Sequence, residues 1–427
     1  MEQELQAIEV NYKNKKRYNT AKYPKRQMKF LTWLIWVLSK LDLMFKKHRV
    51  EKINMEGLKP PYFMLSNHQY FIDFELAALV TYPHRVNNVI NIDGYCKRAW
   101  LMGLIGGICT RKFSNDIHLV KSIKKVLERG DVVGLYPEAR YSACGITSYI
   151  PLSVAKMVKK FKVPVVVIIH HGNHLHTPFW NFRKKRKVPL YTKATQVLTK
   201  EQIEMMSVEE INQVIQKAFI YDEYQYQKEN KILIKEKYRA EGMHKILYQC
   251  PHCLTESKMN SSGSEIYCEE CGKRWMLCED GNLKALEGKT EFTHVPDWYN
   301  WERENVKKEV FEGRYIFKDD VKVYSMPRTT SFMPIGYGKV EHNPKDGFIL
   351  EGNYNNALYR ILRKPHQANS LHVEYDYVHI EPYDCFVINT EDDCYFCYPT
   401  KQNVITKIGF ATEAIYELHA RKIKNQE

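Results

Sequence analysis

Between residues 62 and 169, short apolar runs alternate with longer segments whose apolar residues recur at helical spacing. The short runs are Tyr62–Leu65, Val89–Ile92, Val132–Tyr136 and Val163–Ile169. The helical segments are Phe71–Val80, Asn115–Arg129 and Leu152–Phe161. Strands that alternate with helices in this way form a mainly parallel sheet covered by helices. The sequence therefore predicts an α/β domain with a mainly parallel sheet flanked by helices.

Composition changes along the 427 residues suggest four parts. Residues 1–50 are basic and predicted to be amphipathic helices that dock on a membrane. Residues 51–245 form the α/β domain and 246–288 a compact cysteine unit. Residues 289–427 are predicted to be β-rich and to end in a helix over Ala411–Lys422. Their pattern is vaguely similar to a pleckstrin-homology-like barrel, which by itself transfers no function.

Two capping boxes and a charged segment complete the prediction for the α/β part. Thr199 with Gln202 and Ser207 with Glu210 each match the start of a helix. The second helix is expected to run toward residue 220. A charged stretch, also expected to be helical, continues to about Met243.

The cysteine unit contains two Cys-x2-Cys pairs separated by fourteen residues. Thiolates at this spacing suit a tetrahedral zinc site on a ribbon-like hairpin. Four thiolates leave no open coordination position, so the predicted zinc is structural. The predicted ligands are Cys250, Cys253, Cys268 and Cys271.

The chain carries 11 cysteines in all, an odd number, and its first residues lack the order of a signal peptide. We therefore expect a reducing compartment with free thiols. The formal net charge of +14 predicts an anionic partner, which could be nucleic acid, an anionic membrane or a phosphorylated substrate. Phe30–Leu38 is apolar and rich in tryptophan, but too short to span a membrane. It is either a core helix or a helix lying in the headgroup interface.

The sequence Ser66-Asn67-His68-Gln69-Tyr70-Phe71-Ile72-Asp73 places a histidine and an aspartate where a predicted strand meets a predicted helix. A neutral imidazole can take a proton from an attacking hydroxyl. A carboxylate five residues later can fold back onto the other ring nitrogen and stabilise the imidazolium. His68 and Asp73 are therefore the candidate catalytic pair.

Three further segments follow in order: Gly106-Gly107-Ile108-Cys109-Thr110-Arg111-Lys112-Phe113, Leu135-Tyr136-Pro137-Glu138-Ala139-Arg140 and Val163-Pro164-Val165-Val166. With the His68 segment, they resemble the four motif blocks of the glycerolipid acyltransferase family, whose members include 1-acylglycerol-3-phosphate acyltransferases. The resemblance covers about residues 50 to 195.

The resemblance implies a role for each matching residue. His68 would be the general base and Asp73 its orienting acid. Glu138 would shape the acceptor site. Arg140, with Arg111 or Lys112, would grip the acceptor's phosphate through charge-assisted contacts. The acceptor hydroxyl would attack an acyl thioester directly.

Two departures from the family pattern concern the acceptor headgroup. Ala139 stands in place of a glycine–threonine pair, and loss of the glycine removes easy access to a left-handed turn. In the second block, spacing favours Lys112 as the basic residue, whereas residue type favours Arg111.

Other polar clusters have simpler interpretations. His170, His171, His174 and His176 are interpreted as pocket lining or surface rather than as a metal site. Arg183–Lys187 is a solvated basic run that would attract anionic headgroups. Cys394 and Cys397 are interpreted as two packed thiols.

The predicted function is acyl transfer from acyl-CoA or acyl-carrier protein to a lysophospholipid, with lysophosphatidic acid as the expected acceptor, in phospholipid synthesis. The enzyme would lie in the cytoplasm, on the inner face of the membrane. There are two alternatives. One is a zinc-ribbon protein that binds nucleic acid, although nucleic acid is a less favoured partner than a membrane. The other is a non-catalytic acyltransferase-like protein that binds lipid.

Overall fold

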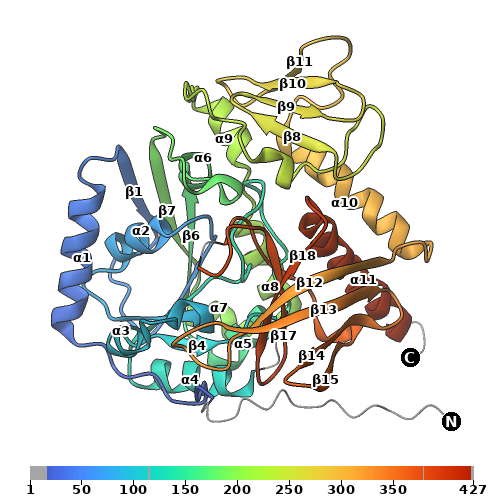
Figure 1. The fold of residues 1–427 in the computed structure, drawn as a ribbon. Coiled ribbons are helices and arrows are strands. Elements are labelled where there is room, and N and C mark those ends of the chain that lie inside the picture. The colour runs from blue at the N-terminus through green and yellow to red at the C-terminus, as the bar shows by residue number, and fades with distance from the viewer. Residues whose placement is uncertain (1–16, 114–115, 378, 425–427) are drawn as a thin grey trace.

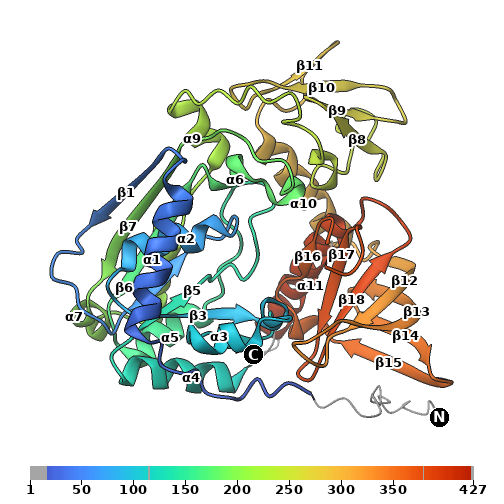
Figure 2. The ribbon, with the colours of Figure 1, turned by 60° about the vertical axis from the view of Figure 1, so that its left-hand side comes forward.

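The computed structural model describes residues 17–113, 116–377 and 379–424, which form three sheets with helices around and between them (Figure 1). The first sheet lies behind the N-terminal helices. The small sheet of the cysteine unit projects at one end, and the C-terminal sheet packs beside the first one (Figure 2).

The first sheet has seven strands in the order β1-β7-β6-β2-β5-β3-β4. Every neighbouring pair is parallel except β6 and β7, which are antiparallel. The mainly parallel sheet is therefore confirmed. Its strands are β1 (His48–Ile53), β2 (Phe63–Ser66), β3 (Val86–Asn91), β4 (Ile108–Thr110), β5 (Val132–Leu135), β6 (Val165–His171) and β7 (Leu190–Leu198).

Helices cover both faces of this sheet because alternate strand residues point to opposite sides. Phe63 and Leu65 of β2 pack against one set of helices, while Met64 packs on the other face against α2. The helices and short 3-10 turns of this part are α2 (Ile72–Thr81), η1 (Ile92–Tyr95), α3 (Ala99–Leu104), α4 (Ile117–Glu128), α5 (Ser153–Phe161), α6 (Asn173–His176), η2 (Phe179–Asn181), α7 (Lys200–Met205) and α8 (Val208–Ala218).

Both predicted capping boxes form. Thr199 accepts from the backbone N–H of Gln202 at the start of α7, and Ser207 does the same for Glu210 at α8. The expected helix toward Met243 is wrong in part. Only α9 (Glu223–Glu229) and the short turn η3 (Met243–Lys245) form, and Lys231 takes a left-handed conformation just after α9.

The N-terminal part differs from its prediction as well. Of the predicted helical segment 1–50, residues 1–16 lie outside the described residues and 17–28 are not helical. Their carbonyl groups instead accept from side chains on and beside the first sheet. Pro24 accepts from Arg129 at the end of α4, Lys25 from Asn87 of β3, and Gln27 from Arg85 just before β3.

Helix α1 (Lys29–Leu43) packs on α2 and presents a large apolar face to solvent. Its most exposed apolar side chains, with those just after the helix, are Phe30, Trp33, Leu38, Leu41, Met44 and Phe45. Among the described helices, none has the length and apolar character needed to cross a bilayer.

The cysteine sheet is antiparallel, with the order β11-β10-β9-β8. Trp275 from this sheet packs edge-on against Trp298 of α10, which joins it to the C-terminal part. The elements are β8 (Met259–Ser262), β9 (Glu265–Cys268), β10 (Arg274–Leu277), β11 (Leu283–Ala285) and α10 (Val295–Phe311).

The C-terminal sheet is antiparallel, in the order β15-β14-β13-β12-β18-β17-β16, and α11 (Ile405–Lys424) closes the fold. No described pairing joins β15 to β16, so hydrogen bonds do not close it into the barrel that the pattern suggested. Cys394 and Cys397 are buried, as expected for packed thiols. The strands are β12 (Phe317–Ser325), β13 (Met333–Asn343), β14 (Gly347–Tyr354), β15 (Ala357–Arg363), β16 (His372–Glu374), β17 (Cys385–Asn389) and β18 (Cys394–Pro399), with a short turn η4 (Pro365–Gln367).

This sheet shares a core with the first one. Ile92 and Tyr95 of η1 pack in one cluster with Val387 and Phe396 of the C-terminal sheet. The carboxyl end of β3 is therefore covered by the last part of the chain.

Candidate functional site

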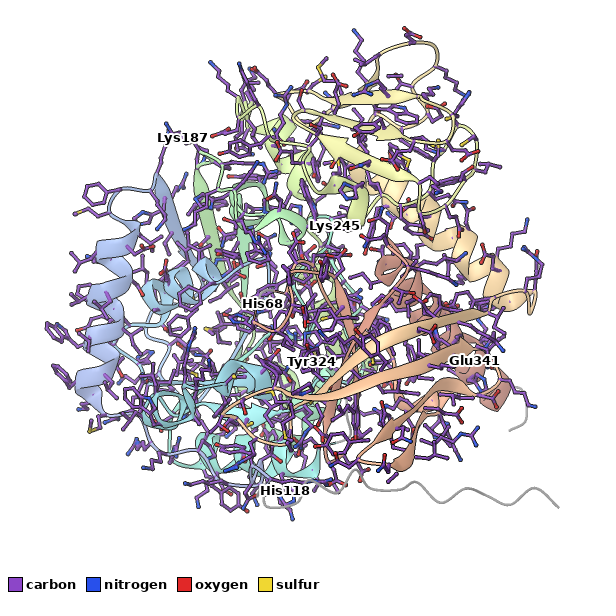
Figure 3. The ribbon with its side chains drawn as sticks, viewed as in Figure 1. His68, His118, Lys187, Lys245, Tyr324 and Glu341 are labelled. Atoms are coloured by element: carbon purple, nitrogen blue, oxygen red, sulfur yellow. The ribbon has the colours of Figure 1, made fainter. Side chains whose placement is uncertain are left out.

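His68 lies in the loop between β2 and α2, near the centre of the molecule (Figure 3). Its Nδ1 is 3.1 Å from Oδ2 of Asp73, which sits in the first turn of α2. The histidine side chain is 22% exposed, whereas Asp73 is completely buried. The structure thus brings the two predicted catalytic residues together, with the imidazole accessible.

Asp73 is held in place by three other donors. Its Oδ2 accepts from the backbone N–H groups of Gln69 and Tyr70, and its Oδ1 accepts from Asn173 Nδ2 at 2.6 Å. Burial alone would raise the pKa of Asp73. The hydrogen bond from His68, the nearby charges of His170 and His68, and the Asn173 amide together hold that pKa below its usual value. Asp73 is therefore an anion that fixes the ring of His68.

Burial lowers the pKa of His68 and outweighs the opposing effect of Asp73. The imidazole is thus neutral near pH 7, with its proton on Nδ1 toward the carboxylate and a lone pair on Nε2. Two aromatic rings enclose it: Tyr136 stacks at 4.0 Å between ring centroids, and Tyr141 lies at 4.2 Å. This environment suits a general base.

The segment Pro137-Glu138-Ala139-Arg140 turns sharply after β5. Ala139 adopts φ of +54°, the left-handed region that glycine would favour, so the turn forms despite the substitution. Glu138 is buried and accepts from Tyr221 Oη and the backbone N–H of Ser148. Burial raises the pKa of Glu138 to about 7.

The predicted phosphate-binding arginines contact the C-terminal part of this chain. Arg140 forms an ion pair of 2.7 Å with Glu413 of α11 and donates to Ser370 Oγ. Arg111 donates to the carbonyl groups of Glu391 and Asp392, each at 3.0 Å. In contrast, the positive charge of Lys112 acts on His68 and lowers its pKa. Of the two second-block residues, Lys112 is thus the one whose charge affects the pKa of His68.

The C-terminal sheet adds residues that no motif indicated. Glu374 and His372 of β16 form a hydrogen bond of 2.7 Å. Asp93 of η1 lies beside them, so that one ring nitrogen and two carboxylate oxygens, atoms that could bind a metal ion, all lie within 4.8 Å of one another. The negative charge of Glu374 also raises the pKa of His68, which partly opposes the effect of burial. Asp93 lies about 280 positions before His372 and Glu374 in the sequence, so no local pattern could have joined it to them.

The four predicted zinc ligands lie together at the ends of the cysteine sheet. The Sγ atoms of Cys250 and Cys271 are 3.8 Å apart, and those of Cys253 and Cys268 are 3.7 Å apart. Four sulfurs at about 2.3 Å from one tetrahedral zinc ion are about 3.8 Å apart. The residues therefore fit a structural zinc ion.

The histidine cluster is a packing feature. His170, His174 and His176 are buried, so a surface position is wrong for them, whereas the alternative of pocket lining holds for His174, which borders a small hollow. His171 pairs with Glu223 at 3.0 Å, an acidic partner that sequence spacing did not reveal. Asn67 locks this region to the His68 loop by exchanging two hydrogen bonds with the backbone of His170.

No family model matches the chain, and no curated protein matches it. Among solved structures, it resembles the 1-acyl-sn-glycerophosphate (LPA) acyltransferase PlsC from Thermotoga maritima. The sequences are 16% identical, the match covers 45% of this chain and 77% of that chain, and the TM-score is 0.37. The likeness is distant.

Proposed function

We propose that this protein is an O-acyltransferase that moves a fatty acyl group from an acyl thioester to the hydroxyl of a lysophospholipid. The observation that carries the proposal is the contact between His68 and Asp73: a neutral, accessible imidazole fixed by a buried carboxylate. The motif order around His68 supports a phosphorylated acceptor such as lysophosphatidic acid.

In the proposed reaction, Nε2 of His68 takes the proton of the acceptor hydroxyl as its oxygen attacks the thioester carbonyl. The resulting imidazolium is stabilised by Asp73, which remains an anion. Collapse of the tetrahedral intermediate forms the ester and breaks the carbon–sulfur bond. His68 then returns its proton to the departing thiolate, which leaves as the thiol of coenzyme A or acyl-carrier protein.

Lys112 is proposed to contact the acceptor's phosphate, because its positive charge is near enough to His68 to lower the pKa of that histidine. Arg111 and Arg140 would serve this role only after giving up their contacts with the C-terminal part. Tyr136 and Tyr141 lie against the imidazole and would shield it from water.

The apolar face of α1 is proposed to bring the enzyme to an anionic membrane. Tryptophan and phenylalanine side chains suit the headgroup interface, and Lys29 and Lys40 on the same helix would meet anionic lipids. Cys250, Cys253, Cys268 and Cys271 would hold zinc, which supplies structural cross-linking of the small sheet.

The test is a lipid-product assay with a panel of lysolipids and acyl thioesters, read by mass. We expect wild-type protein to esterify a lysophospholipid and His68→Ala to lose that activity with its fold intact. His118→Ala is the matched control, because His118 is an exposed histidine on α4 far from the site (Figure 3). Near-wild-type turnover by His68→Ala would refute the mechanism.

A lipid-binding protein without turnover is the second candidate, favoured by the internal contacts of Arg111 and Arg140. The same panel separates the two. Binding of lysolipid without product from any donor would establish the second candidate.

A further inference from the structure

A small hollow lies where the loop after β6, helix α9 and the cysteine sheet meet. It has a volume of about 280 Å³, counting the part open to solvent. The residues around it that matter here are Trp180, Arg186, Gln227, Arg239, Leu277 and Cys278.

Two arginines are buried at this hollow without a carboxylate in direct contact. Arg186 is 3% exposed, although it belongs to the basic run that was expected to be solvated, and Arg239 is 9% exposed. Arg186 donates to the carbonyl of Arg239, and Arg239 donates to the carbonyls of Leu277 and Glu236. Within the described chain, neither guanidinium has an ion-pair partner within 4.0 Å.

Two N–H donors at the same hollow lack a partner among the described residues. They are Nη1 of Arg186 and Nε1 of Trp180, both buried. The Arg186 guanidinium lies 5.1 Å from the centre of the Trp180 ring, so the two donors come from side chains in contact. The carboxylates of Glu236 and Glu241 act on Arg186 only from a distance. A buried guanidinium with an unmade hydrogen bond and no anion in direct contact is costly.

We propose that this hollow binds a phosphate group, either as the free oxyanion or at the end of a small monoester. A guanidinium matches the oxygens of phosphate, and the indole N–H adds a second donor. Hydrogen phosphate also carries an O–H group, which suits the unpartnered Oε1 of Gln227. The bound group would join the first sheet, α9 and the cysteine sheet, independently of the acyltransferase reaction.

Calorimetric titration of the full-length protein with phosphate, sulfate, chloride and glycerol 3-phosphate at constant ionic strength tests the proposal. We expect phosphate to bind more tightly than sulfate or chloride. Tighter binding of glycerol 3-phosphate would support the site and identify a monoester as its source. Absence of binding by phosphate and by glycerol 3-phosphate, or equal binding of chloride, would overturn it.

Arg186→Met should weaken phosphate binding roughly 30-fold or more, because it removes a buried charge partner. Arg183→Met is the matched control, since Arg183 lies in the same basic run but is exposed. Equal weakening in both variants would show that the run binds phosphate from the surface and would refute the buried site.

A crystal of the wild-type protein soaked in arsenate decides the matter if Arg186→Met fails to fold. Arsenate has the shape and charge of phosphate and scatters X-rays anomalously. An anomalous peak beside Arg186 and Trp180 is expected. Water alone in the hollow would refute the proposal.

Discussion

Arg140 and Glu413 form a largely buried ion pair of 2.7 Å that joins the turn after β5 to the last helix of the chain. The motif resemblance assigned Arg140 to the acceptor, but the structure gives it a partner within the protein. The pair therefore links the part of the chain that contains the first sheet to the C-terminal part, and it competes with any role of Arg140 in binding phosphate.

Breaking this ion pair should reduce stability more than activity. We expect Arg140→Met and Glu413→Leu each to lower the free energy of unfolding by roughly 3 kcal/mol, because each removes the direct partner of a buried charge. In Arg140→Met, Glu413 keeps only the longer contact of 3.9 Å with Arg303. The double variant should recover most of that loss. Denaturant titration measures the cycle. A large rise in KM for the lysolipid in Arg140→Met, without loss of stability, would instead return Arg140 to the acceptor site.

Lys112→Met should raise the KM for lysophosphatidic acid about tenfold or more, since a charge-assisted contact is lost. The KM for an uncharged monoacylglycerol should change little. Lys121→Met, at an exposed position on α4, is the control for net charge. If Lys112→Met changes the KM of both acceptors equally, the lysine does not bind the phosphate.

Asp73→Asn should lower kcat by about 10³- to 10⁴-fold, because the amide cannot stabilise the imidazolium or enforce the tautomer. The KM should stay nearly constant. Glu75→Gln serves as control because Glu75 lies on the same helix without contacting His68. A similar loss in both variants would indicate damage to α2 rather than loss of the base.

The pH profile should report His68 directly. Only the neutral ring accepts a proton, and its pKa is lowered from 6.5 by burial. The value of kcat/KM should therefore rise with pH, reach half its maximum below pH 6.5 and be level from pH 7 to 8. A rise centred above pH 7 would contradict the role of His68.

Zinc removal should unfold the cysteine sheet before it unfolds the first sheet. We expect about one zinc per chain by elemental analysis in wild-type protein, and none in Cys253→Ser. That variant should also melt at a lower temperature, because metal-binding energy stabilises the folded state. Cys96→Ser, at a cysteine outside the group, should retain its zinc. Full zinc in Cys253→Ser would disprove the assignment.

Local patterns predicted the elements that local chemistry determines. The strands around His68, both capping boxes and the cysteine group follow from spacing within a few residues, and all are present. The contact between His68 and Asp73 is of the same kind, because five residues across the start of a helix fix it.

Contacts over long sequence distances were not predictable. Arg186 has the composition of a surface run, yet the cysteine sheet buries it. Residues 17–28 look helical by composition, but Arg129, Asn87 and Arg85 donate hydrogen bonds to their carbonyls and hold them outside a helix. The position of Glu374 near His68 depends on the packing of two sheets, which no single segment encodes.

The placement of Glu374 and Glu413 has a consequence for synthesis on the ribosome. Both belong to the final sixth of the chain, yet Glu374 raises the pKa of His68 and Glu413 forms an ion pair with Arg140. The nascent protein can therefore form its first sheet and α1 before these groups emerge. A chain released early would carry the histidine and the apolar helix but would lack the finished surroundings of the imidazole.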